Sequence, residues 1–292
     1  MATIASRAES LLGTGVVATT PVAGGDVCTA TRLRLSNGRS AFIKTRPQAE
    51  TGFFTSEADG LRWLAAATDG VRVPDVLASA DDCLILGWVE SGRATADAAE
   101  EFGRALARMH RCGAERFGAA DDGFIGTLRL PNKAAPSWPE FWATRRILPY
   151  LKAARDRGAL LEADVDRIEA VLARLTELAG PDEPPARIHG DLWSGNVMWG
   201  SDGNAWIVDA AAHGGHRETD LAMLALFGTP NLARILQAYD EEAPLADGFQ
   251  ARVPLHQLHP LLVHAVLFGG SYGPRAGQAA RSLLDGTAGT SN

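Results

Sequence analysis

The amino-acid sequence predicts an α+β protein of two lobes: a small N-terminal lobe built on an antiparallel sheet with one helix, and a larger, mainly helical C-terminal lobe. Two observations support this division. Apolar and polar residues alternate in short runs before residue 90, as strands require, and apolar residues recur at helical spacing over most of the chain after it. The polar triplet Glu90-Ser91-Gly92 is typical of a connector, so we place the lobes at residues 1–89 and 90–292.

Strand and helix signals follow one another in a simple order in the first lobe. Asn37-Gly38 lies between two apolar runs and is a strong signal for a β-hairpin turn. Phe54, Ala58 and Leu61 recur every three or four residues, which predicts a helix. The expected strands are residues 27–35, 40–45, 76–80 and 83–89, and the expected helix is residues 53–67.

The second lobe is expected to be helical except around one loop. Short strands are predicted at residues 187–189, 197–199 and 205–208, so this loop should lie at a strand–loop–strand edge. Pro254 and Pro260 should bend or shorten the helix that contains them, and residues 286–292 should form a frayed tail. The expected helices are residues 96–111, 138–156, 163–179, 219–227, 232–239, 250–268 and 274–284.

The composition is that of an ordinary globular protein. The 292 residues are 46% hydrophobic and 22% charged, and the net charge is −7 at pH 7. This balance lacks the basic surface that nucleic-acid binding requires, so we expect no nucleic-acid partner. The longest apolar stretch, around residues 261–268, contains His264 and is far too short for a membrane span, so we expect no membrane partner.

The N-terminal residues and the cysteines indicate the compartment. Residues 1–9 lack the apolar segment of a secretory signal. The 3 cysteines, Cys28, Cys83 and Cys112, contain no C-x-x-C pair, which argues against a disulfide framework or a zinc site. We therefore expect a cytoplasmic protein with reduced thiols.

The most informative segment is residues 189–196, with the sequence HGDLWSGN. It contains Asp191 and, five positions later, Asn196, and Asp209 follows at the end of a short apolar stretch. An Asp in a turn is usually structural when it stands alone, but an Asp, an Asn and a second Asp in this order are what a kinase-type phosphotransferase needs. Asp191 is the candidate catalytic base, and Asn196 and Asp209 are the candidate Mg²⁺ ligands. The expected architecture is therefore protein-kinase-like, with a nucleotide in the cleft between the lobes.

Residues of the first lobe supply candidate phosphate contacts. Lys44 ends a predicted strand, and Glu57 lies thirteen residues later in the first turns of the predicted helix. A strand lysine held by a helix glutamate can reach the α- and β-phosphates of ATP, although each residue alone would be an ordinary surface group. Gly24-Gly25 lies between predicted strands, where its backbone amides could cover the phosphates. The pair is weak by itself and is not a Walker A sequence.

Further residues near the loop have supporting or substrate-binding interpretations. His189 is expected to be a buried, hydrogen-bonded support for the loop backbone. Asp220 is either a plain helix cap or a group that holds the loop from behind. The indole of Trp193 would pack either on the core or on a sugar or aglycone.

A metal-dependent hydrolase is the alternative interpretation of the same histidines. It would use His189, Asp191, His213 and His216 as metal ligands. It leaves Asn196 and Lys44 without a role, so we do not favour it.

Several longer segments resemble a known family. Beside HGDLWSGN, residues 209–228 (DAAAHGGHRETDLAMLALFG) and 261–273 (LLVHAVLFGGSYG) are similar to the fructosamine kinases, or ketosamine 3-kinases, within the aminoglycoside phosphotransferase-like superfamily. The resemblance extends over almost the whole chain and includes residues 54–64 (FTSEADGLRWL), 117–127 (FGAADDGFIGT) and 138–141 (WPEF). The HGDxxxxN pattern defines only the superfamily, whereas LWSGN and GHRETDLAM are more specific.

The resemblance implies ATP-dependent, Mg²⁺-assisted phosphorylation of the sugar 3-hydroxyl of a ketosamine, either a small molecule or a glycated protein lysine. The unstable product would release the amine, which is deglycation. It also implies that the segment with Leu86, Trp88 and Val89, at the start of the connector region, contacts the adenine. Trp193, His213 and His216 are the candidate substrate contacts.

The chain departs from the family pattern at a few positions. Ala210 stands where the family has proline, and His213 and Gly214 stand where aromatic residues are common. Asp26 lies near the position of a frequent cysteine, and Val263 replaces an asparagine. These changes leave the phosphoryl-transfer residues intact and affect the expected substrate preference. The alternatives are a kinase for another hydroxylated amine, such as an aminoglycoside or a choline-like compound, and a non-catalytic nucleotide-binding module.

Overall fold

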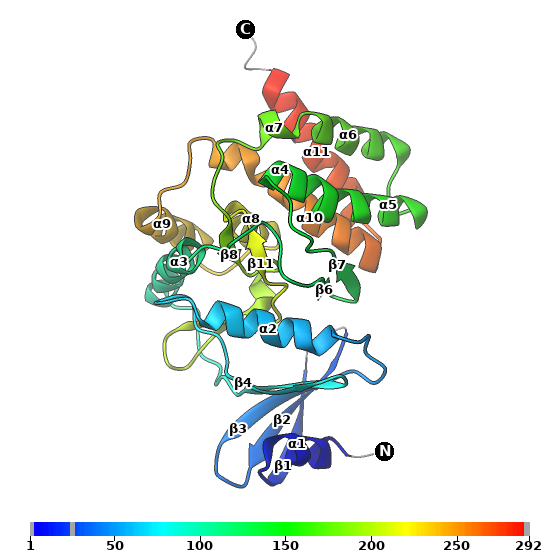
Figure 1. Ribbon diagram of the computed structural model, residues 1–292. Helices are drawn as coiled ribbons and strands as arrows, with labels where there is room; N and C mark the ends of the chain where they lie inside the picture. Colours follow the sequence, from blue (N-terminus) through cyan, green and yellow to red (C-terminus); the bar gives the residue numbers. More distant parts are fainter. Residues whose placement is uncertain (1–2, 24–26, 289–292) are drawn as a thin grey trace.

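The computed structural model describes residues 3–23 and 27–288, with a five-stranded sheet at one end and the helices of the second half of the chain at the other (Figure 1). The strand order is β1-β2-β3-β5-β4, and every neighbouring pair is antiparallel. The strands are β1 (Val16–Val22), β2 (Thr29–Leu35), β3 (Ser40–Thr45), β4 (Val76–Ala80) and β5 (Cys83–Gly87). The predicted α+β, two-lobed fold is confirmed.

Both faces of the sheet are covered, so alternate residues of β5 pack into two different hydrophobic cores. Cys83 and Ile85 pack with Ala8 of helix α1 (Ile4–Leu12), whereas Leu84 and Leu86 pack with helix α2 (Phe53–Ala65). Figure 1 shows α2 between the sheet and the helical lobe and α1 on the outer face. This double burial explains the uninterrupted apolar run in β5.

The sequence prediction missed α1 and gave no bounds for the strand candidate before Gly24, which is β1. Helix α1 is short and begins at a Thr3 cap, whose side chain accepts a hydrogen bond from the Ser6 amide. Strand β1 is a largely exposed edge strand, so it has no alternation of buried and exposed residues to detect. Its edge position also tolerates Pro21, which cannot donate a ladder hydrogen bond.

The helical lobe is built around α10 (Phe249–Phe268), which packs on α5, α8 and α11. Its other helices are α3 (Ala96–Arg111), α4 (Trp138–Phe141), α5 (Leu148–Asp156), α6 (Glu162–Ala173), α7 (Leu175–Leu178), α8 (Glu218–Leu226), α9 (Leu232–Glu242) and α11 (Tyr272–Ala288). A π-helical segment, Trp142–Ile147, joins α4 to α5. None of the helices in the described part of the chain has both the length and the apolar character that crossing a bilayer would require.

The helix bounds in this lobe agree only in part with the sequence prediction. Helix α10 matches the expected residues 250–268 closely, and Pro254 and Pro260 do not shorten it, because Leu255, Leu258 and other buried side chains pack along it and outweigh the lost backbone bonds. The predicted helix 163–179 is divided at Arg174 into α6 and α7. Helix α11 continues to Ala288 through part of the expected tail, whose last four residues lie outside the described residues.

Short strands position the loop at residues 189–196. Strand β8 (Ala186–Ile188) enters it and pairs with β11 (His213–Gly215), and β9 (Val197–Trp199) leaves it and pairs with β10 (Ala205–Ile207). Strand β11 and the hairpin of β6 (Gly123–Ile125) and β7 (Leu128–Leu130) were not predicted. Strand β11 has the sequence His-Gly-Gly and lacks the apolar run that indicated β9 and β10.

The connector between the lobes is bonded to the β9–β10 hairpin. The Gly92 amide donates to the Trp199 carbonyl at 2.6 Å, and the Ser201 amide donates to the Glu90 carbonyl at 2.8 Å. The connector is therefore anchored by backbone hydrogen bonds beside the loop at residues 189–196.

Candidate active site

Three polar side chains singled out from the sequence meet around the loop at residues 189–196, here called the HGD loop. The Asn196 side-chain amide donates to the backbone carbonyl of Asp191 at 2.8 Å and to its carboxylate at 3.2 Å. The Val208 amide donates to the Asn196 carbonyl at 3.1 Å, which brings Asp209 beside them. The fold thus brings Asp191, Asn196 and Asp209 together, so that their side-chain oxygen atoms form a compact group.

Two buried residues hold the backbone of the HGD loop. The Asp220 carboxylate accepts hydrogen bonds from the amides of His189 and Gly190 at 2.7 and 2.9 Å. His189 accepts from the Asp191 amide at Nδ1 (3.2 Å), so its Nε2 carries the proton and donates to the Val208 carbonyl at 2.8 Å. Burial lowers the pKa of His189, which favours this neutral form.

Gly190 permits the turn that presents Asp191. Its φ is +82°, in the left-handed region that favours glycine. A Cβ at this position would also lie 2.3 Å from the Ala211 carbonyl oxygen. Any larger residue would therefore push the HGD loop away from the segment that follows Asp209.

Lys44 on β3 joins the two lobes through carboxylates. Its Nζ lies 2.5 Å from Glu57 Oε2 on α2 and 2.7 Å from Asp209 Oδ1. The Lys44 and Glu57 side chains are only 9% and 10% exposed, whereas that of Asp209 is 53% exposed and opens to the cleft. Asp209 has φ +56°, unusual for a non-glycine residue and typical of strained functional positions.

The charges around Asp191 set its proton affinity. Burial, reinforced by the Asp209 carboxylate, raises the pKa of Asp191 to about 7. Burial alone would lower the pKa of Lys44, but Glu57 and Asp209 outweigh it and raise that pKa. Burial opposes the ionisation of Asp209, yet the Lys44 ammonium keeps the pKa of Asp209 below its ordinary value. The site therefore places the Lys44–Asp209 ion pair beside a carboxyl group, Asp191, whose pKa is raised toward neutral pH.

These residues lie in a cleft of about 1290 Å³ between the sheet and the helical lobe. The predicted site residues that line it are Lys44, Glu57, Leu86, Trp88, Val89, Asp191, Trp193, Asn196, Asp209 and His213. Gly24 and Gly25, like Asp26, lie outside the described residues. The structure does not bring His216 to this cleft; His216 lines a smaller pocket of about 250 Å³ with Trp138 and Glu183.

One wall of the cleft is aromatic. The Trp193 side chain contacts Phe227 edge-on at a centroid distance of 5.9 Å, and Trp193 remains 38% exposed. Gly195 makes room for the indole, because a Cβ there would lie 2.3 Å from the Trp193 ring. Helix α10 extends this wall with Val263, His264, Leu267 and Phe268. The wall offers an apolar surface next to the charged HGD loop.

The arrangement opposes the hydrolase interpretation. Both ring nitrogens of His189 are engaged in hydrogen bonds, and His213 uses Nδ1 to donate to the Ala211 carbonyl at 2.8 Å. His216 lies outside the cleft. These histidines and Asp191 therefore do not converge as metal ligands.

His110 is a supporting residue that sequence reasoning missed. It lies at the end of α3, where Nδ1 is 2.8 Å from the Tyr239 hydroxyl and Nε2 is 3.2 Å from the Asp220 carboxylate. It thus fixes the group that holds the HGD loop. No local signal distinguishes it, because its partners are more than a hundred positions away in the sequence.

The fold and the cleft together define a kinase-like phosphotransferase: an antiparallel sheet carries a lysine, one helix carries the glutamate that it contacts, and a loop of the helical lobe carries carboxylate and amide oxygens in the same cleft. The chain belongs to the fructosamine kinase family, whose model matches residues 1–286. A "probable ketoamine kinase" from Enterococcus faecium is 35% identical over 266 residues, covering 88% of this chain and 92% of the relative.

Solved structures agree with this assignment. A crystal structure from Thermobifida fusca, described as a "putative fructosamine-3-kinase", is 50% identical and covers 97% of this chain and 99% of its own, with a TM-score of 0.93. The aminoglycoside phosphotransferase APH(4)-Ia, solved with ADP and hygromycin B, has a TM-score of 0.61 at 16% identity, covering 99% of this chain and 100% of its own, and it shares the fold alone. The protein is therefore a phosphotransferase enzyme, and the predicted family is confirmed.

Proposed function

We propose that the protein transfers the γ-phosphoryl group of ATP to the 3-hydroxyl of a ketosamine, the rearranged adduct of a sugar and an amine. One observation carries the proposal. Asp191, Asn196, Asp209 and Lys44 meet at one cleft, in a chain whose relatives are named as ketoamine kinases. They would supply the base, the metal ligands and the phosphate-binding lysine of phosphoryl transfer.

The nucleotide would bind on the sheet side of the cleft. Leu86, Trp88 and Val89 would flank the adenine, and Lys44 would contact the α- and β-phosphates while Glu57 holds its ammonium. The backbone of Gly24 and Gly25 would cover the phosphates. The neighbour solved with ADP supports use of a nucleotide by this fold.

The donor set fits Mg²⁺. Asp209 offers a carboxylate that is open to the cleft, and Asn196 donates from its nitrogen to Asp191, which leaves its side-chain oxygen for a cation. Mg²⁺ prefers such oxygen ligands and shares them with phosphates and water. When bound there, it would neutralise charge that develops on the phosphate oxygens.

Asp191 would orient the acceptor. Its carboxylate accepts the proton of the sugar hydroxyl as the oxygen–phosphorus bond forms and the bond to ADP breaks. A pKa raised to about 7 suits this role, because a good part of the group is ionised at neutral pH and the carboxylate still binds the proton it receives. His213 and Trp193 line the same cleft and would contact the acceptor. The 3-phosphorylated product would release its amine, so the reaction would reverse glycation.

A substrate panel tests the proposal. Purified protein would be incubated with MgATP and either fructosyl-lysine or ribulosyl-lysine, with aminoglycosides and choline alongside, and mass spectrometry would detect the gain of one phosphoryl group. We expect phosphorylation of a ketosamine, absent in Asp191→Asn. Phosphorylation of an aminoglycoside or choline alone would show that the acceptor is not a ketosamine. Tight ATP binding without turnover of any compound would favour a non-catalytic nucleotide-binding module.

A further inference from the structure

The first turn of α8 connects the HGD loop to the helix that forms the acceptor wall. Asp220 grips the loop through the amides of His189 and Gly190. The two residues before it, Glu218 and Thr219, bind α10 instead. Three consecutive residues thus hold two different walls of the cleft.

The bonds to α10 are buried and specific. Both carboxylate oxygens of Glu218 accept from the Arg252 guanidinium, at 2.6 and 2.9 Å. The Thr219 hydroxyl lies 3.0 Å from His256 Nδ1, and His256 Nε2 lies 3.3 Å from Glu218 Oε2. Glu218 and His256 are fully buried. In such surroundings charge-assisted bonds hold a fixed geometry, because water cannot replace either partner.

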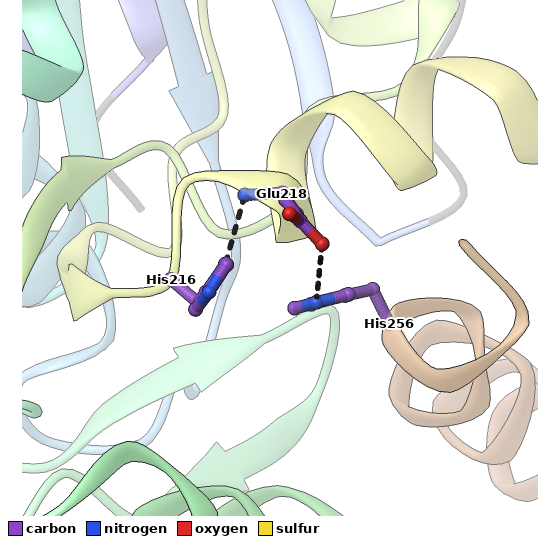
Figure 2. A group of neighbouring side chains, drawn as sticks. All are labelled: His216, Glu218 and His256. Carbon is purple, nitrogen blue, oxygen red and sulfur yellow. Dashed lines mark hydrogen bonds and ion pairs between the residues drawn. The ribbon is translucent and has the colours of Figure 1, made fainter. Parts of the chain in front are cut away.

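The group of His216, Glu218 and His256 has the residue types of a metal site, and Figure 2 shows the three side chains directed toward one another. Its hydrogen bonds oppose that interpretation. His216 Nδ1 accepts from the Glu218 amide at 3.2 Å, which keeps the ring proton on Nε2, where a metal would have to bind. A cation would also have to displace the Arg252 guanidinium from Glu218. The group is therefore better described as an ion-pair lock.

The other end of α10 reaches the cleft. Val263, His264, Leu267 and Phe268 line it, two to four helical turns beyond Arg252 and His256. A shift of α8 along α10 would move these side chains relative to Asp191. The lock therefore fixes the separation between the acceptor wall and the catalytic base.

We propose that Glu218 and Thr219 are positioning residues that set the acceptor wall of α10 against the HGD loop. The nature of the acceptor rests on the proposed ketosamine kinase activity, but the mechanical link between the two walls does not. Nucleotide contacts on the sheet lie outside this link.

Two variants of different severity test the proposal. Thr219→Val removes one hydroxyl and keeps the shape of the side chain, and Glu218→Gln removes the charge that Arg252 binds. Asp164→Asn is the control, because it breaks another carboxylate–guanidinium pair, the partly buried one with Arg167 in α6, away from the cleft. Each protein would be measured for acceptor kcat/KM, for ATP affinity by calorimetry, and for amide hydrogen exchange of the HGD loop.

We expect acceptor kcat/KM to fall several-fold in Thr219→Val and about tenfold or more in Glu218→Gln, with ATP affinity within about twofold. The amides of His189 and Gly190 should exchange faster in both variants and stay unchanged in Asp164→Asn. Wild-type kinetics and exchange in Thr219→Val would overturn the proposal, whether or not Glu218→Gln folds. Stoichiometric zinc that disappears in His216→Ala would overturn it as well.

Failure of the proposed function can be distinguished from failure of the proposed positioning role. If the wild-type protein phosphorylates no ketosamine, that function fails while the hydrogen-exchange comparison still decides whether the lock holds the HGD loop.

Discussion

The Lys44 ammonium lies 2.7 Å from the Asp209 carboxylate, although 165 positions separate the two residues in the sequence. This contact joins a strand of the sheet to the segment after the HGD loop. It also orients an Asp whose backbone is in the left-handed region. The two side chains to which we assign the metal and the phosphates are therefore held in place by each other.

Replacing Asp209 tests its role as a metal ligand. We expect Asp209→Asn to weaken ATP binding in the presence of Mg²⁺ by about tenfold or more and to change metal-free binding much less, because an amide is a poorer Mg²⁺ ligand than a carboxylate. Calorimetric titration with Mg²⁺ and with a chelator would measure both. The exposed Asp202→Asn serves as the control. An unchanged dependence on Mg²⁺ would rule out the ligand assignment.

Replacing Asp191 separates acceptor chemistry from nucleotide binding. Asp191→Asn should lower kcat by at least about 100-fold, because the amide cannot take the hydroxyl proton. Its ATP affinity should stay within about threefold of wild type, since Asp191 faces the acceptor. Steady-state kinetics and calorimetry on the same preparation would show this. Comparable loss of ATP binding would contradict the role.

Gly190 and Gly38 form a matched pair for the HGD-loop geometry. Both have a positive φ, +82° and +83°, but an added Cβ would meet the Ala211 carbonyl at 2.3 Å in the first case and nothing within 4 Å in the second. Each alanine variant should lose about 1–3 kcal/mol of stability from backbone strain. Only Gly190→Ala should also lose activity. Thermal unfolding and turnover of the two variants would be compared, and equal activity would sink the steric argument.

His213 provides a pH dependence of stability with a defined sign. Burial, with a contribution from the nearby Arg146 charge, lowers the pKa of His213 to about 3 from an ordinary 6.5. Between these values the unfolded chain binds a proton that the folded protein does not, so His213 destabilises the fold as the pH falls below 6.5. The effect approaches about 1.4 kcal/mol per pH unit. His213→Asn keeps an amide donor for the Ala211 carbonyl and removes the titration.

Denaturant unfolding of both proteins between pH 7 and pH 5 would measure this difference. The unfolding free energy of the variant should decline less steeply than that of the wild type as the pH falls. Parallel curves would show that His213 is not held neutral in the fold.

The sequence was sufficient to predict the candidate site where its residues lie close together in the chain. Asp191 and Asn196 share one loop, and Lys44 and Glu57 lie on adjacent elements, so their convergence in the cleft could be anticipated. His110, in contrast, reaches Asp220 across 110 positions, and nothing in its neighbourhood in the sequence indicates that partner. His216 was wrongly predicted as a substrate contact, because the sequence does not show where the chain turns after β11. It lies one residue beyond β11 and turns into a separate pocket with Glu183.

Tertiary packing can outweigh a local preference. Two prolines weaken the signal for a long helix, yet α10 keeps nearly the predicted bounds of residues 250–268 because its neighbours bury most of its length. Edge strand β1 gave the opposite problem, since exposed strands lack the alternation that reveals buried ones.

The backbone bonds at Glu90 and Gly92 constrain how the cleft can open. Because these bonds fasten the connector to the β9–β10 hairpin, the sheet cannot slide away from the helical lobe without breaking them. A rotation of the sheet about the connector would leave both bonds intact, but it would separate Lys44 from Asp209. Bulky nucleotides or acceptors would then enter the cleft when the sheet rotates. Distance measurements between spin labels on β2 and α9 would detect this rotation as a change in their separation.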